Sequence, residues 1–292
     1  MAVSTSTTVA ATIYAKVIES LIVMYQYDEV TAVNNFRYRS LVGEHTAVAS
    51  FPRFNKDAVA AVATETTSLT PTTWNLTTTV DITVGRVGIA REISATAEED
   101  SILERSMRMD EWVKDAARLF GEQLDTDGTA LYAGITATVG VTATALSIAT
   151  LVAGFASQRA NKARGQAVVH LHDLQLKQLQ VAQAAATATP WAVFFAPNAD
   201  TSQYGGLFMG APVYASSKNP TANVAADRLG AIFSNGTDMP QYCGLALVVK
   251  RLPSSLEQTD ILQDANIWCS FMRYGVGLIA NNFCTKIVSQ NS

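Results

Sequence analysis

The feature that most constrains the fold of this chain is one long helical pattern that runs from Thr96 to Tyr132. Thr96 and Glu99 have the spacing of a capping box at its start. Apolar residues then recur at helical spacing on one stripe, namely Ile102, Met109, Val113, Ala116, Phe120, Leu124 and Leu131. At 1.5 Å per residue, such a helix would be a rod of roughly 54 Å. Gly121 and Gly128 each weaken it by about 1 kcal/mol relative to Ala, so a bend or a break is expected near either glycine.

Before the helix, an extended and threonine-rich excursion runs from His45 to Ile93. Its apolar residues alternate as in a half-buried strand, but they occupy even positions up to Val84 and odd positions after Gly85. This change of phase predicts a bulge or a bend near Gly85 and Arg86. The returning arm alone could reach on the order of 65 Å. Two strands of that length have no core of their own and leave bare edges, so we expect the excursion to lie on a neighbouring molecule.

A compact region of strands and helices is predicted after the long helix. Alternating or short apolar runs predict strands at 135–141, 167–171, 190–195, 245–251, 267–274, 276–280 and 284–288. Helical spacing predicts helices at 145–156 and 174–186, the second capped by Asp173, and an N-terminal helix at 9–24.

One uncharged stretch raises the alternative of a membrane protein. No charge lies between Asp127 and Arg159, a length that could cross a bilayer, and positive residues follow it. Its glycines, threonines and strand-like alternation favour a buried strand followed by a buried helix. A membrane anchor that uses 134–158 is the alternative.

Composition narrows the classes of function. The chain has 292 residues, of which 48% are hydrophobic and 16% are charged, whereas charged residues usually make up about a quarter of a soluble domain. Such a surface is easier to explain if other chains cover much of it. The net charge is −4, so the sequence has no basic surface for sequence-specific binding of nucleic acid.

No catalytic or metal-binding constellation is visible. His170 and His172 would share one face of a strand, but no third residue has ligand spacing to them. The glycine run at 205–206 has no Walker lysine nearby. The three cysteines are far apart and are interpreted as buried free thiols, compatible with a reducing cytoplasm: Cys243, Cys269 and Cys284. We therefore expect no enzymatic activity, no cofactor and no metal, and we interpret Asp125 and Asp127 as solvated or inter-subunit residues.

Residues 205–220 form an apolar strand that is broken by Gly210 and Pro212 and ends in small residues. This segment resembles one found in the major capsid proteins of tailed double-stranded-DNA bacteriophages, the family with the Hong Kong 97-type capsid fold. The order of elements is similar as well: a long hairpin, a long helix, a compact α+β region and then this segment. The trailing Asp127-Gly128 of the helix is similar to the acid-then-glycine ending in that family.

The resemblance implies an α+β chain with several parts. These are an N-terminal arm at 1–41 that reaches a neighbour, an extended β-hairpin loop at 42–93, a peripheral domain at 94–142 and 245–292 with the long spine helix, and an axial domain at 143–244. The axial domain would gather around fivefold and sixfold axes. The chain lacks a long charged helical scaffolding segment, so any scaffold would be a separate protein.

The resemblance also implies a function. The chain would be a structural subunit that self-assembles, as pentamers and hexamers, into the icosahedral head of a tailed phage. The head would form in the host bacterial cytoplasm, would enclose double-stranded DNA without sequence-specific binding, and could use separate scaffolding, portal and decoration proteins. The candidate inter-subunit contacts are Phe51, Phe54, Lys56, Asp57, Trp74, Arg86, Arg91 and Glu92. Some members crosslink a loop lysine to an asparagine of a neighbour, and Lys56 with Asn281 or Asn282 is the pair available here.

Two other interpretations remain beside this one. The first is the shell of an encapsulin-like cellular nanocompartment of the same fold, which would need cargo and a chain without the long arm at 1–41. The second is the membrane-anchored protein described above. An enzyme is a third class, for which the sequence offers no residues.

Overall fold

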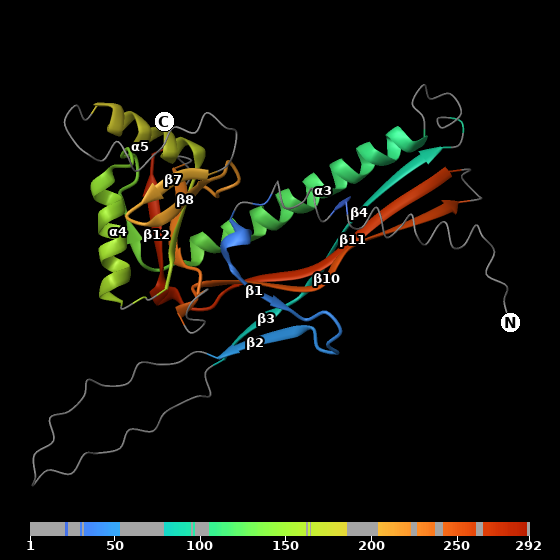
Figure 1. Ribbon diagram of the computed structural model, residues 1–292, viewed down its shortest axis with the longest axis horizontal. Coiled ribbons are helices and arrows are strands. Elements are labelled where there is room, and N and C mark those ends of the chain that lie inside the picture. The colour runs from blue at the N-terminus through green and yellow to red at the C-terminus, as the bar shows by residue number, and fades with distance from the viewer. Residues whose placement is uncertain are drawn as a thin grey trace, which may run out of the picture.

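The computed structural model describes residues 21–22, 30, 32–52, 79–94, 96, 105–161, 163, 165–185, 204–222, 227–236, 242–260 and 265–290. These residues form an elongated half and a compact half, which lie side by side (Figure 1). The elongated half is a four-stranded sheet in the order β1-β10-β11-β4, with one long helix along its length. Its strands are β1 (Arg37–Ser40), β10 (Leu245–Asp260), β11 (Ala265–Leu278) and β4 (Gly85–Ser94).

The long helix, α3 (Arg105–Ala130), lies against one face of this sheet. Trp112, Val113 and Phe120 are buried in one cluster with Trp268 and Tyr274 of β11. The ring centroids of Trp112 and Trp268 are 6.4 Å apart. The predicted apolar stripe is therefore confirmed over its described part, and burial of that stripe, rather than helix propensity, holds the helix in place.

The predicted break of the helix is wrong. Helix α3 continues through Gly121 and Gly128 and ends in a 3-10 turn, η2 (Leu131–Gly134). A Cβ atom at Gly128 would collide with the side chain of Val33, so this glycine is explained by close packing of the chain that precedes β1. Thr96 is helical, whereas its expected capping partner Glu99 lies outside the described residues.

The compact half is a six-stranded sheet in the order β5-β12-β9-β6-β8-β7. Its strands are β5 (Thr138–Val139), β12 (Cys284–Ser289), β9 (Arg228–Ser234), β6 (Ala167–Leu171), β8 (Ala211–Ala215) and β7 (Tyr204–Phe208). Helices α4 (Ile148–Ala160) and α5 (Asp173–Ala185) belong to the same half (Figure 1). Leu151 and Phe155 of α4 and Leu179 of α5 share a core with Val169, Ile232 and Ile287 of the strands.

A two-stranded sheet forms the base of the excursion. It pairs β2 (Val48–Pro52) with β3 (Thr79–Thr83), with Phe51 opposite Val80. The chain then passes Val84 and enters β4, which pairs with β11 instead. The predicted change at Gly85 is confirmed: Ile82 and Val84 are buried below one sheet face, and the odd-numbered Val87, Ile89 and Ile93 pack against the core under α3.

Several predicted elements change in extent. Only 138–139 of the strand predicted at 135–141 is a strand, and Val141 is 66% exposed. The strand predicted at 276–280 is the end of β11 and does not stand alone. The segment 205–220 is a hairpin, β7–β8, whose turn contains Met209 and Gly210. The strand predicted at 190–195 lies outside the described residues, as does the N-terminal helix except at 21–22.

The cap of α5 also differs from the prediction. The Nδ1 atom of His172 accepts a hydrogen bond of 3.1 Å from the backbone N–H of Leu174. The side chain of Gln175 accepts one of 3.0 Å from the backbone N–H of His172. This reciprocal pair is a capping box in which His172 takes the place predicted for Asp173, and Asp173 is the first residue of the helix.

The expected domain boundaries do not follow the sheets. Strand β12 pairs with β9, so 284–289 belong to the compact half although we placed them with the spine helix. Strand β1, at the end of the predicted arm, pairs with β10 of its own chain. Strand β4 joins the long sheet, so only β2 and β3 of the loop expected at 42–93 form a separate two-stranded sheet.

Two smaller expectations can be compared with the structure. Among the described residues, no helix is both long enough and apolar enough to cross a membrane. All three cysteines are free thiols: Cys243 and Cys284 are buried, and Cys269 is partly exposed.

Candidate assembly surfaces

The base of the excursion packs on the sheet face opposite α3. Phe51 is 1% exposed and Ile82 is 4% exposed, and they share a core with Ala246 and Val248 of β10. Polar contacts fasten the same strands, because the Arg39 guanidinium donates a hydrogen bond of 2.8 Å to the carbonyl oxygen of Ser50. The base is thus part of its own subunit, and the expectation that the excursion has no partner within its chain is wrong for β2 and β3.

Phe51 requires a specific correction. It is buried within its own chain, and the guanidinium carbons of Arg37 and Arg39 lie 5.5 and 5.6 Å from the centre of its ring. Such cation–π contacts stabilise the ring in place. Phe51 is therefore a packing residue of the subunit and does not present its side chain to a neighbour.

The same sheet face continues beyond this base with less cover. Directly opposite residues of antiparallel strands share a face, so Leu256 lies beside Cys269, and Phe271 lies on the same face. Leu256 is 60% exposed, and Cys269 and Phe271 are only partly buried. The Arg86 guanidinium stacks 3.9 Å from the centre of the Phe271 ring. Alternation along β4 places Glu92 on this face as well, so two of the predicted contact residues border an apolar strip.

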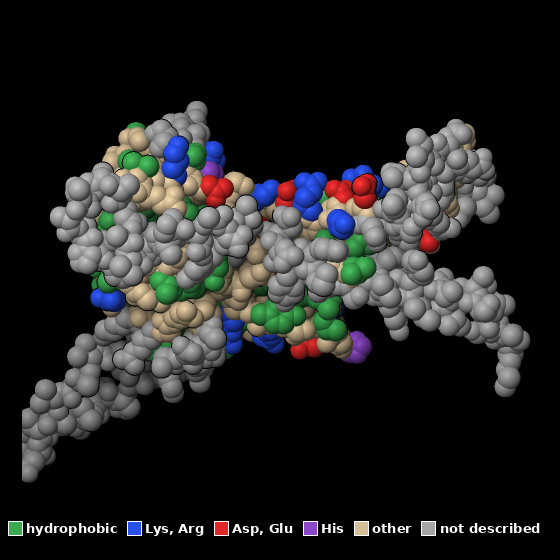
Figure 2. All heavy atoms as spheres, turned by 45° about the horizontal axis from the view of Figure 1, so that its top comes forward, with side chains coloured by type: hydrophobic (Ala, Val, Ile, Leu, Met, Phe, Trp, Pro, Cys, Tyr) green, Lys and Arg blue, Asp and Glu red, His purple; other side chains and the backbone are tan. Residues whose placement is uncertain are grey.

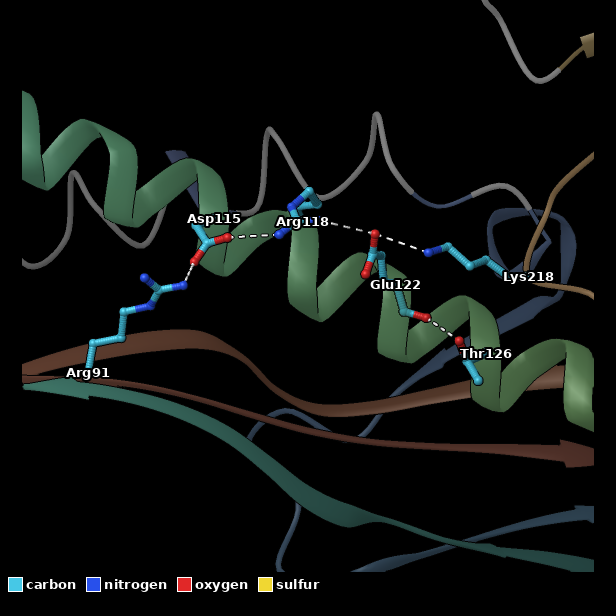
Figure 3. Close-up of polar contacts among 6 residues, drawn as sticks. All are labelled: Arg91, Asp115, Arg118, Glu122, Thr126 and Lys218. Carbon is cyan, nitrogen blue, oxygen red and sulfur yellow. Dashed lines mark hydrogen bonds and ion pairs between the residues drawn. The ribbon is translucent and has the colours of Figure 1, made fainter.

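Arg91 lies on the other face, on a charged ridge along α3. It pairs with Asp115, and the Arg118 guanidinium donates to Asp115 at 3.0 Å and lies 3.5 Å from Glu122. Lys218, from the chain after β8, completes the series at 3.0 Å from Glu122. Figure 3 shows these contacts along one side of the helix, together with the hydrogen bond from the Thr126 hydroxyl to the Glu122 carbonyl.

The ridge combines charges of both signs, because Arg91, Arg118 and Lys218 are paired with Asp115 and Glu122. Alternating blue and red side chains follow α3 in Figure 2, and the described charges of both signs are paired with each other. Exposed ion pairs of this kind stabilise a fold by about 0–1 kcal/mol each and weaken with salt. The ridge therefore links β4, α3 and the compact half, and its two acids offset most of the positive charge that a phosphate backbone would bind.

A buried carboxylate joins the two halves beneath this ridge. Asp125 is 1% exposed, and its Oδ1 accepts hydrogen bonds from the backbone N–H groups of Ala32 at 2.9 Å and Val33 at 3.3 Å. Its Oδ2 accepts a hydrogen bond of 3.4 Å from the hydroxyl of Ser216. The interpretation of Asp125 as a solvated or inter-subunit residue is therefore wrong. Asp125 directly follows Leu124, which belongs to the apolar stripe of the long helix, and this position was the signal for its burial.

His170, which the sequence offered as a possible metal ligand, is also a buried residue. His170 is fully buried, its ring centroid lies 5.7 Å from that of Tyr132, and neither of its ring nitrogens has a hydrogen-bond partner. Burial lowers the pKa of His170 to about 3 because the charged ring would lose its hydration. The pKa of Tyr132 is raised well above its usual value, first by burial and then by the Asp125 carboxylate. Within the described part of the chain, no three residues are grouped so that they could hold a metal ion.

Half of the predicted contact residues lie outside the described residues. These are Phe54, Lys56, Asp57 and Trp74, all of which belong to the excursion beyond β2 and before β3. Asn281, one partner considered for a crosslink, accepts a hydrogen bond of 3.1 Å from the backbone N–H of Thr136.

Comparison with known proteins relates this arrangement to a fold. No family model and no curated protein matches the sequence. A structure from Gordonia phage Cozz is 10% identical, with a TM-score of 0.63 and coverage of 89% of this chain and 86% of that chain. The mature capsid of bacteriophage PhiM1 is 12% identical, with a TM-score of 0.59 and coverage of 90% and 88%. A virus-like particle from Pyrococcus furiosus is 8% identical, with a TM-score of 0.61 and coverage of 94% and 99%.

At such low identity the likeness concerns the fold. It extends over most of the length of both chains. The chain has the α+β fold of tailed-phage capsid proteins, the Hong Kong 97-type capsid fold.

Proposed function

We propose that this chain is the structural subunit of the icosahedral head of a tailed phage, and that the head encloses double-stranded DNA. The observation that carries the proposal is the likeness to the PhiM1 mature capsid over 90% of this chain and 88% of the other. The match covers most of both chains, so the proposal concerns the chain as a whole and not one part of it. The subunit would act as a structural protein of the virion, without catalysis.

A shell of many copies requires one set of surfaces to be used repeatedly. Heterologous contacts between identical chains close into pentamers and hexamers when the rotation closes, and these assemble into a shell. The low charged fraction of 16% suits a subunit whose surface is largely covered by its copies. The net charge of −4 and the paired charges of the ridge on α3 suit an enclosure that does not bind DNA by its sequence.

We infer that the sheet face around Phe271 receives part of a neighbouring subunit. It carries the exposed Leu256 and the stacked Arg86 beside apolar neighbours, and it continues directly from the face that the chain's own β2 and β3 cover. Arg86 and Glu92 border this face, whereas Arg91 is engaged on the α3 side. Phe54, Lys56, Asp57 and Trp74, which belong to the part of the excursion between β2 and β3, stay contact candidates. Separate scaffolding, portal and decoration proteins are candidate further partners.

A cellular nanocompartment shell is the second candidate, because the virus-like particle from Pyrococcus furiosus matches 94% of this chain and 99% of its own. The two candidates differ in what the shell contains. Particles made in the native host should protect double-stranded DNA from nuclease if the chain is a phage head. Particles that instead retain one protein at fixed stoichiometry, with no protected DNA, would favour the nanocompartment.

Light scattering coupled to size-exclusion chromatography tests the proposal at the level of the subunit. We expect the purified protein to form capsomer-sized oligomers or shells at high concentration and moderate salt. A protein that stays strictly monomeric under these conditions would contradict the proposal.

A further inference from the structure

Strand β4 forms one edge of the long sheet. It is hydrogen-bonded to β11 on one side, and no strand of the described part of the chain lies on its other side. Its pairing with β11 runs through all ten residues, from Gly85 to Ser94, without a bulge. None of these ten residues is buried. The outer edge of β4 thus presents a regular row of backbone N–H and C=O groups over about 33 Å, a template on which another strand can pair.

The other side of the same sheet shows how an open edge is protected. Strand β1 pairs only with 246–249 of β10, so the outer half of β10 is an edge as well. That half contains Pro253, and its pairing with β11 shifts register on both sides of Arg251. Proline, bulges and lysines prevent an edge from pairing with another chain. Strand β4 contains neither proline nor lysine nor a bulge, so its edge stays open to a further strand.

The charges of β4 fit a second copy of β4 itself. When two copies pair antiparallel about Ile89, with like faces of the two sheets together, Arg86 of each copy lies directly opposite Glu92 of the other. Two pairs of opposite charge form at once, and the small residues between them, Gly88 and Ala90, lie opposite each other. Pairing about Arg86 or about Glu92 would instead place like charges directly opposite, which destabilises a sheet.

The packing of the subunit leaves room for this arrangement. Pairing about one residue with like faces together is a twofold rotation, so both copies of α3 would lie on the same face. Helix α3 packs on β11, and the two β11 strands would be three strand spacings apart, about 14 Å. Packed helices need only about 8–10 Å. On the opposite face, the Arg86 guanidinium lies 3.9 Å from the centre of the Phe271 ring, a stack that restricts the arginine at the edge.

We propose that the outer edge of β4 pairs antiparallel with β4 of a second copy, about a twofold axis at Ile89, and that two Arg86–Glu92 pairs fix the register. The inference rests on the proposed function and names one of the contacts between copies. A twofold contact uses the same surface on both subunits and cannot close a ring of five or six. It therefore joins a subunit of one capsomer to a subunit of the next.

Charge reversal in the full chain tests the register. Arg86→Glu and Glu92→Arg each place two pairs of like charges opposite each other, whereas a one-to-one mixture of the two variants restores opposite charges at both pairs. We expect each variant alone to associate about tenfold more weakly than the unsubstituted chain, and the mixture to recover. Glu44→Arg is the control, because Glu44 is exposed after β1, at the other edge of the sheet. Light scattering over a concentration series measures all of them.

A crosslink tests the geometry independently of charge. The residue on the axis faces its own copy at a Cα–Cα distance of about 4.5–5.5 Å, which a disulfide can span. Ile89→Cys, in a chain that also carries Cys269→Ser, should therefore give a disulfide-linked dimer when the assembled protein is oxidised with diamide. Ala90→Cys in the same background is the matched control, because the two copies of position 90 would be about 8 Å apart, beyond the reach of a disulfide.

The outcomes separate this contact from the proposed function. Shells that form without the crosslink at position 89, or with equal crosslinking at 89 and 90, would refute the contact and leave the proposed function standing. A mixture that associates no better than either charge variant alone would also refute the contact. If Arg86→Glu does not fold, the crosslink still decides. Crosslinked pairs that never form capsomers or shells would keep the contact and refute the proposed function, and a chain that forms neither would refute both.

Discussion

At the scale of single residues, burial decides the role of most side chains that the sequence made conspicuous. Phe51 was expected at an inter-subunit contact and is instead buried in its own chain, in contact with two arginines of β1. Asp125 was expected in solvent and is buried, where it accepts backbone hydrogen bonds. His170 has no ligand role among the described residues and is a buried neutral ring. These roles depend on neighbours far along the chain, which a local pattern does not reveal.

Phe120 tests the packing of the long helix. It is fully buried between α3 and the long sheet, so Phe120→Ala should lower the free energy of unfolding by about 3–5 kcal/mol. Phe120→Leu keeps more of the buried volume and should cost less. Denaturant unfolding followed by circular dichroism measures both variants. Equal stability of Phe120→Ala and the unsubstituted chain would show that the face of the helix has been assigned wrongly.

His170 should make the subunit sensitive to mild acid. Its folded-state pKa of about 3 lies below the ordinary value of 6.5, so the unfolded chain binds a proton that the folded chain does not. The free energy of unfolding is not reduced by protonation of His170 above about pH 6.5. Below that pH it falls by about 1.4 kcal/mol per pH unit as the pH is lowered toward 3. Tyr132 is the ionisable side chain whose ring packs against His170, with the ring centroids 5.7 Å apart. Stability of His170→Leu, measured from pH 7 to pH 5, should decline less steeply than that of the unsubstituted chain; parallel curves would contradict this account.

At the scale of elements, the sequence predicted those whose pattern is local. The strand at 167–171 has the predicted bounds, and the change of phase at Gly85 separates β3 from β4. Strand β9 was not predicted because 229–234 is buried on both faces and shows no alternation. Strand β10 continues to Asp260, although the predicted strand ended at Arg251. The prediction was too short because the outer half of β10 is polar and contains Pro253, features that disfavour a strand in a sequence pattern. The crossing of β12 into the other sheet is a tertiary pairing that no local pattern contains.

Asp125 connects helix α3 with the chain at Ala32 and Val33 and with Ser216 after β8. Its removal should loosen the chain at Ala32 and Val33. Asp125→Ala leaves the buried N–H groups of Ala32 and Val33 without their acceptor and should cost about 1–3 kcal/mol. Asp125→Asn keeps one carbonyl oxygen as acceptor and should cost less. Hydrogen exchange should rise at Ala32 and Val33 in Asp125→Ala, whereas the exposed control Glu111→Gln should leave it unchanged. Unaltered exchange in Asp125→Ala would mean that other contacts hold this segment.

At the scale of the whole molecule, the subunit is elongated, with one apolar strip partly open and one two-stranded sheet, β2 and β3, packed on the same face of the long sheet (Figure 1). Isolated two-stranded excursions are marginal in water, and open apolar strips mark interaction sites. Both features are explained together if each subunit covers part of the next. The sequence alone predicted that neighbouring subunits cover each other, but it could not predict which residues of β2 and β3 are buried within their own subunit.

The excursion beyond β2 and β3 should matter for assembly and not for the fold. Replacing 56–72 with a short Gly/Ser linker removes no residue of the described cores and leaves β2 and β3 intact. We expect a folded subunit by circular dichroism that forms irregular shells or none. A subunit that unfolds would show that this segment belongs to its own core, and regular shells of full stability would show that it makes no important contact.

Electron microscopy of the expressed protein in negative stain tests the central claim most directly. The account predicts closed, icosahedral particles of uniform diameter, or pentameric and hexameric capsomers that close into shells when a scaffold is supplied. A preparation of folded protein that shows only monomers or open aggregates, with and without a scaffold, would contradict the claim that this chain is the subunit of a shell.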